Sequence, residues 1–264
     1  MSRLKIIGLC LVAIFVVTAL GASSAWAEAP EYGRCLKAEK NAKKEYNGAF
    51  SDSKCTKEVP VGERAKKGKY KWLPGAENKK FTSSGGIGVL ETVGGSGTEC
   101  KSETSTGEFA PGNNKEEKNI IVKFKECITL DEPCSTPGAA AGEIVTNELE
   151  ATVGWEKKAA KKTDVMLYPA KSVASGLFTE FSCTGIVIKV RGHVLVPIKN
   201  DKMTSTETLK FKATKGKQKP ENWEGTPEHA ILEAHFADNG WEQAGQTITT
   251  TLKGEEELEL NAVV

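Results

Sequence analysis

Residues Gly185–Lys199 read GIVIKVRGHVLVPIK, the longest apolar run after the first 27 residues. Six of its large apolar residues share one parity along the chain: Ile186, Ile188, Val190, Val194, Val196 and Ile198. Its basic residues share the other: Lys189, Arg191, His193 and Lys199. This period of two predicts a long strand with one face in the core. Gly192 falls in step with the apolar positions and predicts a bend or break within the strand.

Similar short runs recur at about ten-residue intervals from Phe81 onward, separated by Gly, Pro, Asn and Ser clusters. They are GIGVLETV (86–93), NIIVKFKEC (119–127), GEIVTNEL (142–149), TDVMLYP (163–169), GLFTEFSC (176–183), ETLKFKA (207–213), HAILEAHF (229–236), QTITTTL (246–252) and EELELNAV (256–263). No stretch shows sustained helical periodicity. The pattern predicts an all-β fold, an antiparallel sandwich or barrel-like domain over residues 81–264.

Residues 28–80 differ in composition from this domain and form a Lys-rich N-terminal segment. Within it, KYKWLPG predicts a strand that ends at a Pro-Gly turn. Residues 34–80 carry 14 Lys and Arg against 6 Asp and Glu, a net charge of +8, whereas residues 221–264 carry 1 Lys against 10 acids, a net charge of −9. Three interpretations stay open: the two ends lie side by side and neutralise each other, both are simply solvated, or the basic segment binds an anionic wall polymer, nucleic acid or a lipid surface.

The first 27 residues have the layout of a secretory signal peptide. Arg3 and Lys5 precede an uncharged run that closes on Ala25-Trp26-Ala27. We expect cleavage after Ala27 and a mature chain that is secreted or associated with the cell envelope, without a membrane span. The alternative is an uncleaved anchor, because about 20 apolar residues can cross a bilayer as a helix.

Six cysteines remain after the leader, which contains the seventh, Cys10. An even number in an exported chain predicts three disulfides, although six cysteines allow 15 pairings. The preferred set is Cys35–Cys55, Cys127–Cys134 and Cys100–Cys183. No C-x2-C pair is present, so we assign no metal site to these residues.

The clearest arrangement of chemically active side chains is His229, Glu233 and His235 in HAILEAH. On a strand they would share the outer face, with neighbours about 7 to 13 Å apart at ~3.3 Å per residue, too far for one metal ion. GGSGT (94–98) departs from the G-x-S-x-G motif of hydrolases at its last position, and Ser51-Asp52-Ser53-Lys54 lacks the partner motifs of an S-x-x-K enzyme. We therefore assign no catalytic, cofactor-binding or metal-binding residue, and no cofactor.

Four tryptophans outside the leader are available for packing or for stacking on a sugar: Trp72, Trp155, Trp223 and Trp241. Trp223 lies in a loop-like stretch, TKGKQKPENWEG, and packing against the core is the commoner outcome for such a residue.

Several segments together resemble a family of exported, cysteine-containing, β-rich actinobacterial proteins of uncharacterised function. They are YGRC (32–35), GAFSDSKCT (48–56), YKWLPG (70–75), FKECITLDEPCSTPGAAAGEIVTNELEATVG (124–154), EFSCTGIVIKVRGHVLVPI (180–198) and GKQKPENWEG (216–225). The resemblance covers most of the mature chain and implies an exported β-rich protein with shared disulfides. It carries over no catalytic or ligand-binding residue.

These features favour an exported, disulfide-bonded β-domain with a binding or structural role at the cell envelope or outside the cell. A cell-wall polymer or another envelope protein would be its partner, and nucleic acid is disfavoured. Two alternatives stay open. One is an exported hydrolase whose site forms only in the fold, and the other is a wall-polymer-binding protein that uses the basic residues 34–80.

Overall fold

The computed structural model describes residues 30–76, 80–199, 202–224, 230–237 and 239–261. The expected leader and its cleavage site after Ala27 lie outside these ranges. The described chain forms nineteen strands: β1 (Glu31–Lys37), β2 (Tyr70–Pro74), β3 (Lys80–Gly85), β4 (Gly88–Thr92), β5 (Gly97–Cys100), β6 (Ser102–Phe109), β7 (Glu116–Lys125), β8 (Ile128–Thr129), β9 (Glu132–Ser135), β10 (Ile144–Val145), β11 (Leu149–Lys157), β12 (Lys162–Pro169), β13 (Leu177–Cys183), β14 (Ile186–Gly192), β15 (Val194–Ile198), β16 (Thr204–Thr214), β17 (Lys217–Lys219), β18 (Leu232–Phe236) and β19 (Trp241–Asn261). Its helical parts are α1 (Arg64–Lys67) and the 3-10 turns η1 (Val61–Glu63) and η2 (Lys158–Ala160).

Eight of these strands form a closed antiparallel ring. The order is β13, β14, β18, β19, β4, β5, β8 and β9, and β9 pairs back with β13 through Cys134 opposite Cys183. Closure leaves no free strand edge in this ring. The all-β prediction is confirmed, and of its two architectures the protein adopts the barrel.

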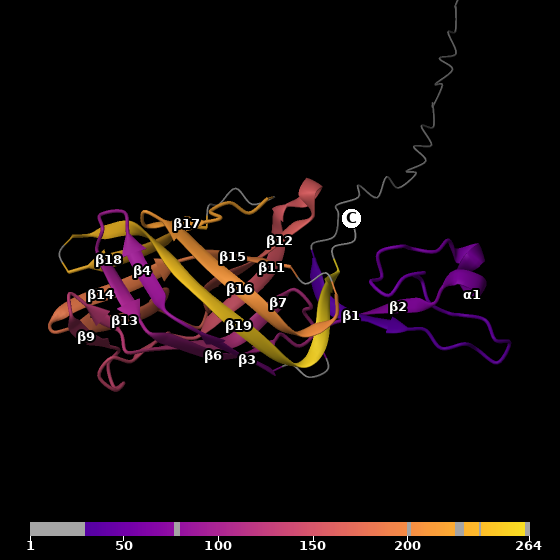
Figure 1. Ribbon diagram of the computed structural model, residues 1–264, viewed down its shortest axis with the longest axis horizontal. Helices are drawn as coiled ribbons and strands as arrows, with labels where there is room; N and C mark the ends of the chain where they lie inside the picture. The colour runs from indigo at the N-terminus through magenta and orange to yellow at the C-terminus, as the bar shows by residue number, and fades with distance from the viewer. Residues whose placement is uncertain (1–29, 77–79, 200–201, 225–229, 238, 262–264) are drawn as a thin grey trace, which may run out of the picture.

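A second set of paired strands continues the barrel. We call the closed ring the first tier and this set the second tier. Its strands pair in the order β15, β12, β11, β7, β6, β3, β19 and β16, and the two end strands, β15 and β16, lie in contact with each other. β19 spans both tiers, pairing with β4 and β18 near its start and with β3 and β16 further along (Figure 1).

The run Gly185–Lys199 also crosses between the tiers, as β14 and β15. Gly192 has φ +102° and ends β14, so the expected bend lies at this glycine. The expected inward parity holds for Ile188, Val190, Val194, Val196 and Ile198, which are all buried in the core. Ile186 is partly buried against that core, and Leu195, which has the other parity, is also buried.

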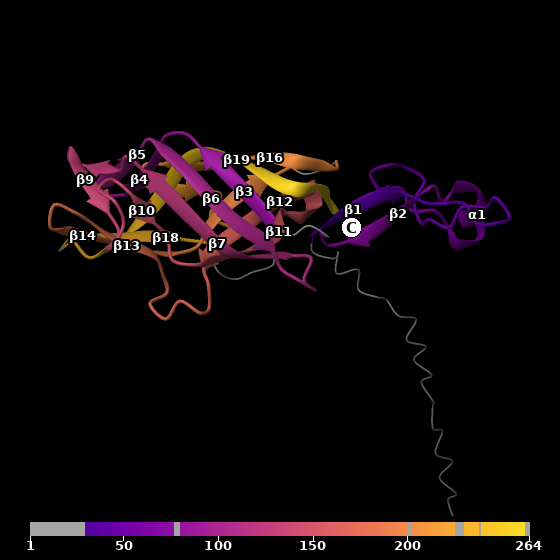
Figure 2. The same ribbon diagram turned by 90° about the horizontal axis from the view of Figure 1, so that it is seen from below.

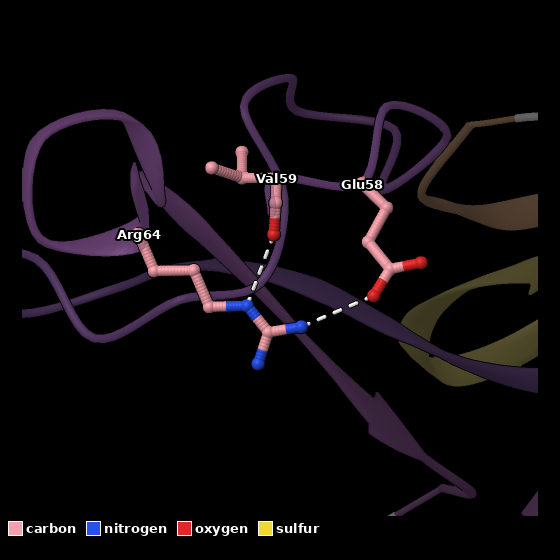
Figure 3. A network of polar contacts seen from close by, with 3 residues as sticks. All are labelled: Glu58, Val59 and Arg64. Carbon is pink, nitrogen blue, oxygen red and sulfur yellow. Dashed lines mark hydrogen bonds and ion pairs between the residues drawn. The ribbon is translucent and has the colours of Figure 1, made fainter. Parts of the chain in front are cut away.

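Residues 31–74, from the start of β1 to the end of β2, form a small lobe that projects from one end of the barrel (Figures 1 and 2). β1 joins it to the barrel by pairing with β2 on one side and with the last residues of β19 on the other. The Cys35–Cys55 disulfide staples the lobe, as expected. Arg64, at the start of α1, donates to the backbone oxygen of Val59 at 3.1 Å and pairs with Glu58 at 3.1 Å (Figure 3).

The two oppositely charged ends of the chain meet only in part. Arg34 of β1 forms an ion pair with Glu256 of β19 at 3.7 Å, where the acidic end of the chain runs beside β1. The lysines further along the lobe lie beyond this contact, because the lobe projects away from the barrel.

All six cysteines after the leader are bonded, but two of the three expected pairs are wrong. The protein has Cys100–Cys127 and Cys134–Cys183 in place of Cys127–Cys134 and Cys100–Cys183. Cys127 precedes β8, and it bonds to Cys100 at the end of β5, the strand that pairs with β8. Cys134 lies in β9, and it bonds to Cys183 of β13, the strand that pairs with β9. Three disulfides are typical of an oxidising, extracellular-type compartment.

Among the described residues, no helix has the length and apolar character needed to cross a membrane.

Candidate ligand-binding cavity

The barrel interior contains a cavity of about 190 Å³ whose lining is mainly apolar. Both tiers contribute to its wall, with residues such as Leu90 from β4, Val165 from β12 and Leu209 from β16. The strands place these side chains inside because alternate residues point to the interior of a barrel. An apolar cavity of about 150 Å³ can hold a molecule the size of benzene. The cavity is therefore large enough for a small apolar ligand.

Glu103 of β6 is a buried carboxylate in this wall, with 5% of its surface exposed. Ser83 of β3 donates to its Oε1 at 2.9 Å, and Thr250 of β19 donates to its Oε2 at 2.7 Å. Ser105, also on the wall, lies 2.7 Å from the Ser83 hydroxyl. Burial raises the pKa of Glu103, although the two hydroxyl donors act in the opposite direction. The result is a polar patch in a mainly apolar wall.

Glu117 of β7 is the second deeply buried carboxylate on the wall, and its environment differs. It accepts a hydrogen bond of 2.6 Å from the Tyr32 hydroxyl. Burial raises its pKa to about 7, against the smaller lowering effect of that hydrogen bond. Because Tyr32 belongs to β1, this contact ties the strand that enters from the lobe to the barrel interior.

Tyr32 also belongs to an aromatic cluster at this end of the cavity. Its ring contacts Phe109 edge-on, with centroids 4.9 Å apart, and Phe109 contacts Phe81 at 5.4 Å. Tyr32 and Phe109 line a second hollow of about 290 Å³ as well, formed with residues 74–76 and 110–114. These two rings therefore stand between the cavity and the hollow.

Asp164 is a third buried carboxylate, on β12 but outside the cavity lining. It is fully buried, and neither carboxylate oxygen has a hydrogen-bond partner within the described part of the chain. Burial, with a further contribution from Glu156, raises its pKa to about 7, and Lys162 opposes the shift. Gly154 lies opposite Asp164 on β11, and the indole of Trp223 covers Gly154 so closely that a methyl group there would clash. Trp223 thus packs on the outer surface of the barrel.

The residues singled out in HAILEAH do not form one site. Glu233 pairs with Arg191 at 2.8 Å, and His235 contacts the Trp241 ring at 5.5 Å, while His229 lies outside the described residues. Arg191 lies over the same Trp241 ring, 3.9 Å from its centroid. In the described ranges, no group of three or more His, Cys, Asp or Glu side chains could hold a metal ion. Glu233, Arg191, His235 and Trp241 are therefore surface residues that contact one another across β14, β18 and β19.

The other sequence candidates have local or packing roles. Asp52, in the S-x-x-K stretch, accepts hydrogen bonds from the backbone and hydroxyl of Thr56 and from the Lys57 backbone, so it organises a turn. Trp155 is buried, and the Trp72 Nε1 donates to Glu31 at 2.6 Å.

Sequence reasoning missed Glu103 and Glu117. A signal existed for Glu103, since it shares the inward parity of β6 with Ser105 and Phe109. Glu117 had none, because a bulge in β7 near Asn119, where φ is +53°, changes the parity between Glu117 and Ile120.

Comparison of the chain with protein families, with curated proteins and with solved structures finds no match.

Proposed function

We propose that the protein is an exported binding protein that holds a small, predominantly apolar molecule inside its barrel. The observation that carries this proposal is the cavity of about 190 Å³ with its largely apolar lining. Eight-stranded barrels are of a size to hold one small ligand in this way. The signal-peptide layout of residues 1–27 and the three disulfides support export to the cell envelope or beyond.

The test is titration calorimetry with 2-phenylethanol, a neutral probe with one aromatic ring that suits the cavity. The expected result is saturable binding to the wild-type protein. Leu90→Trp places a larger side chain in the cavity and should abolish binding. Ile87→Trp is the matched control, because Ile87 is 58% exposed, and it should bind as the wild type does.

Val165→Phe, on β12 of the same wall, repeats the test with a smaller increase in volume in case Leu90→Trp does not fold. Circular dichroism and thermal melting establish that each variant is folded. Binding that survives in both folded cavity variants would place the probe elsewhere and contradict the proposal.

The basic lobe supports a second function, retention on an anionic wall polymer. Among the residues that the structure describes, seven exposed lysines of the lobe form no ion pair: Lys37, Lys43, Lys44, Lys57, Lys66, Lys69 and Lys71. They lie on the part of the chain that projects from the barrel (Figure 2). Such a surface attracts polyanions through screened charge–charge interactions.

Retention on isolated cell walls at increasing salt tests this second function. The wild type should elute as salt rises, because the attraction is screened. Replacing Lys43, Lys44, Lys66 and Lys69 by serine should lower the salt concentration at which it elutes. The same change at Lys210, Lys212, Lys215 and Lys217, exposed lysines of the barrel, is the control of equal charge. An equal effect of the lobe and barrel substitutions, or retention that does not change with salt concentration, would contradict the proposal.

A further inference from the structure

Two of the acidic groups on the cavity wall have hydroxyl groups as partners in place of bases. Four glutamates line the cavity, and no lysine, arginine or histidine of the described chain does. Two of the four have other partners near the barrel end: Glu256 pairs with Arg34, and Glu207 accepts from the Lys199 backbone at 3.4 Å. Glu103 and Glu117 are the two whose partners are neutral hydroxyl groups.

A carboxylate held in an apolar wall by neutral groups alone is costly for a folded protein. Removing an ionised carboxylate from water is unfavourable unless a cation or several strong donors replace the water. Glu103 receives one donor on each oxygen, and both come from hydroxyl groups. Each oxygen keeps further acceptor capacity, since a carboxylate can accept about four hydrogen bonds.

The surroundings of Glu103 match the hydrogen-bonding needs of a primary ammonium group. Such a group has one positive charge and three N–H donors. The Glu103 carboxylate supplies the charge, and the hydroxyl oxygens of Ser105 and Thr250 supply further acceptors on the same wall. Leu90, Phe124 and Ile248 are among the apolar residues that complete the lining for the rest of the molecule.

Glu117 fits this role less well. The phenol of Tyr32 already occupies its Oε1, and the pair lies at the end of the cavity where β1 enters. The Glu117 carboxylate therefore serves a contact within the protein, between β7 and β1.

We propose that the ligand is an apolar amine and that Glu103 is the counter-ion for its ammonium group. This inference rests on the proposed binding function and names the ligand class. The raised pKa of Glu103 agrees with it, because a bound cation would offset the burial that disfavours the charged carboxylate.

The test compares three probes of one shape at pH 7.5 by titration calorimetry: 2-phenylethylamine, 2-phenylethanol and phenylacetate. The amine should bind the wild type at least about tenfold more tightly than the alcohol, because a hydrogen-bonded charge pair replaces a neutral contact. Phenylacetate should bind most weakly of the three.

Glu103→Gln keeps the size of the side chain and removes its charge. It should lower the affinity for the amine by about tenfold or more and change that for the alcohol by less than about threefold. Glu108→Gln is the control, since Glu108 lies on the same strand with its carboxylate paired to Lys118 at 3.3 Å outside the cavity.

The failure of this inference is distinguishable from failure of the binding function itself. Equal binding of amine and alcohol to the wild type, or an amine preference that Glu103→Gln does not reduce, overturns the amine proposal and leaves a neutral-ligand barrel. Absence of binding by the alcohol and the amine alike overturns both proposals.

Discussion

Glu117 shows how a single residue makes the stability of this barrel depend on pH. Its ordinary pKa is 4.5, and burial raises it to about 7 in the folded protein. Between these two values the folded state binds more protons than the unfolded state. The free energy of unfolding therefore falls as the pH rises through this window, and the contribution is complete below it and lost above it.

Glu117→Gln should remove this dependence. At pH 8 the variant should exceed the wild type in unfolding free energy by about 3 kcal/mol, on the scale of 1.36 kcal/mol per pKa unit, and at pH 4.5 the two should be nearly equal. Urea denaturation at both pH values measures the difference. Glu116→Gln, at the exposed neighbouring position, should show no such change. A gap that is the same at pH 4.5 and 8 would contradict the assignment.

Asp164 leads to a second prediction about a buried charge. Its two oxygens lack hydrogen-bond partners among the described residues, and burial raises its pKa to about 7. Asp164→Val should raise the unfolding free energy at pH 8 by about 1–3 kcal/mol, because an apolar residue with high strand propensity replaces an unpaired carboxylate. Asp164→Asn, which keeps a polar group in the same place, should gain less. Chemical denaturation ranks the three proteins, and destabilisation by valine would indicate a partner for Asp164.

At the scale of strands, the period of two in the sequence was enough to locate most of the interior. It placed Ile188, Val190 and Val196 in the core, as the structure does. It failed where a strand departs from regular pairing, as at the β7 bulge that turns Glu117 inward. The period of two could not predict the disulfide partners either. Cys134 and Cys183 meet because β9 pairs with β13, and these two cysteines are 49 residues apart in the sequence. Local patterns carry no information on such long-range pairing.

The bend between β14 and β15 makes a prediction at this scale. Gly192 has φ +102°, and an added Cβ would lie 2.0 Å from the backbone oxygen of Ile231. Gly192→Ala should lower the unfolding free energy by about 3 kcal/mol or more, because both strain and a backbone clash oppose it. Gly86→Ala, where the structure leaves open space, is the control and should change stability little. Urea denaturation of both variants provides the comparison, and equal stabilities would contradict the bend.

At the scale of the whole molecule, the disulfides divide between lobe and barrel. Cys35–Cys55 closes 20 residues of the lobe, whereas Cys134–Cys183 joins two strands of the closed ring. Replacing both cysteines of the ring pair by serine should cost about 4 kcal/mol of unfolding free energy by loop-closure entropy, and weaken binding of 2-phenylethanol as the ring loosens. The same change in the lobe pair should leave that binding within about threefold, since the cavity wall lies mainly in the barrel. Calorimetry and denaturation of the two double variants separate these roles, and equal loss of binding in both would contradict the division.

The central claim is that a small apolar molecule occupies the barrel interior, and methyl NMR tests it most directly. Leu90, Val165 and Leu209 line the cavity, whereas Val61 and Val187 are exposed on the outside. During titration with 2-phenylethanol, the methyl signals of the first three should shift and saturate together, and those of the last two should stay in place. Shifts confined to the exposed methyls, or no saturable shift at the interior ones, would contradict the claim.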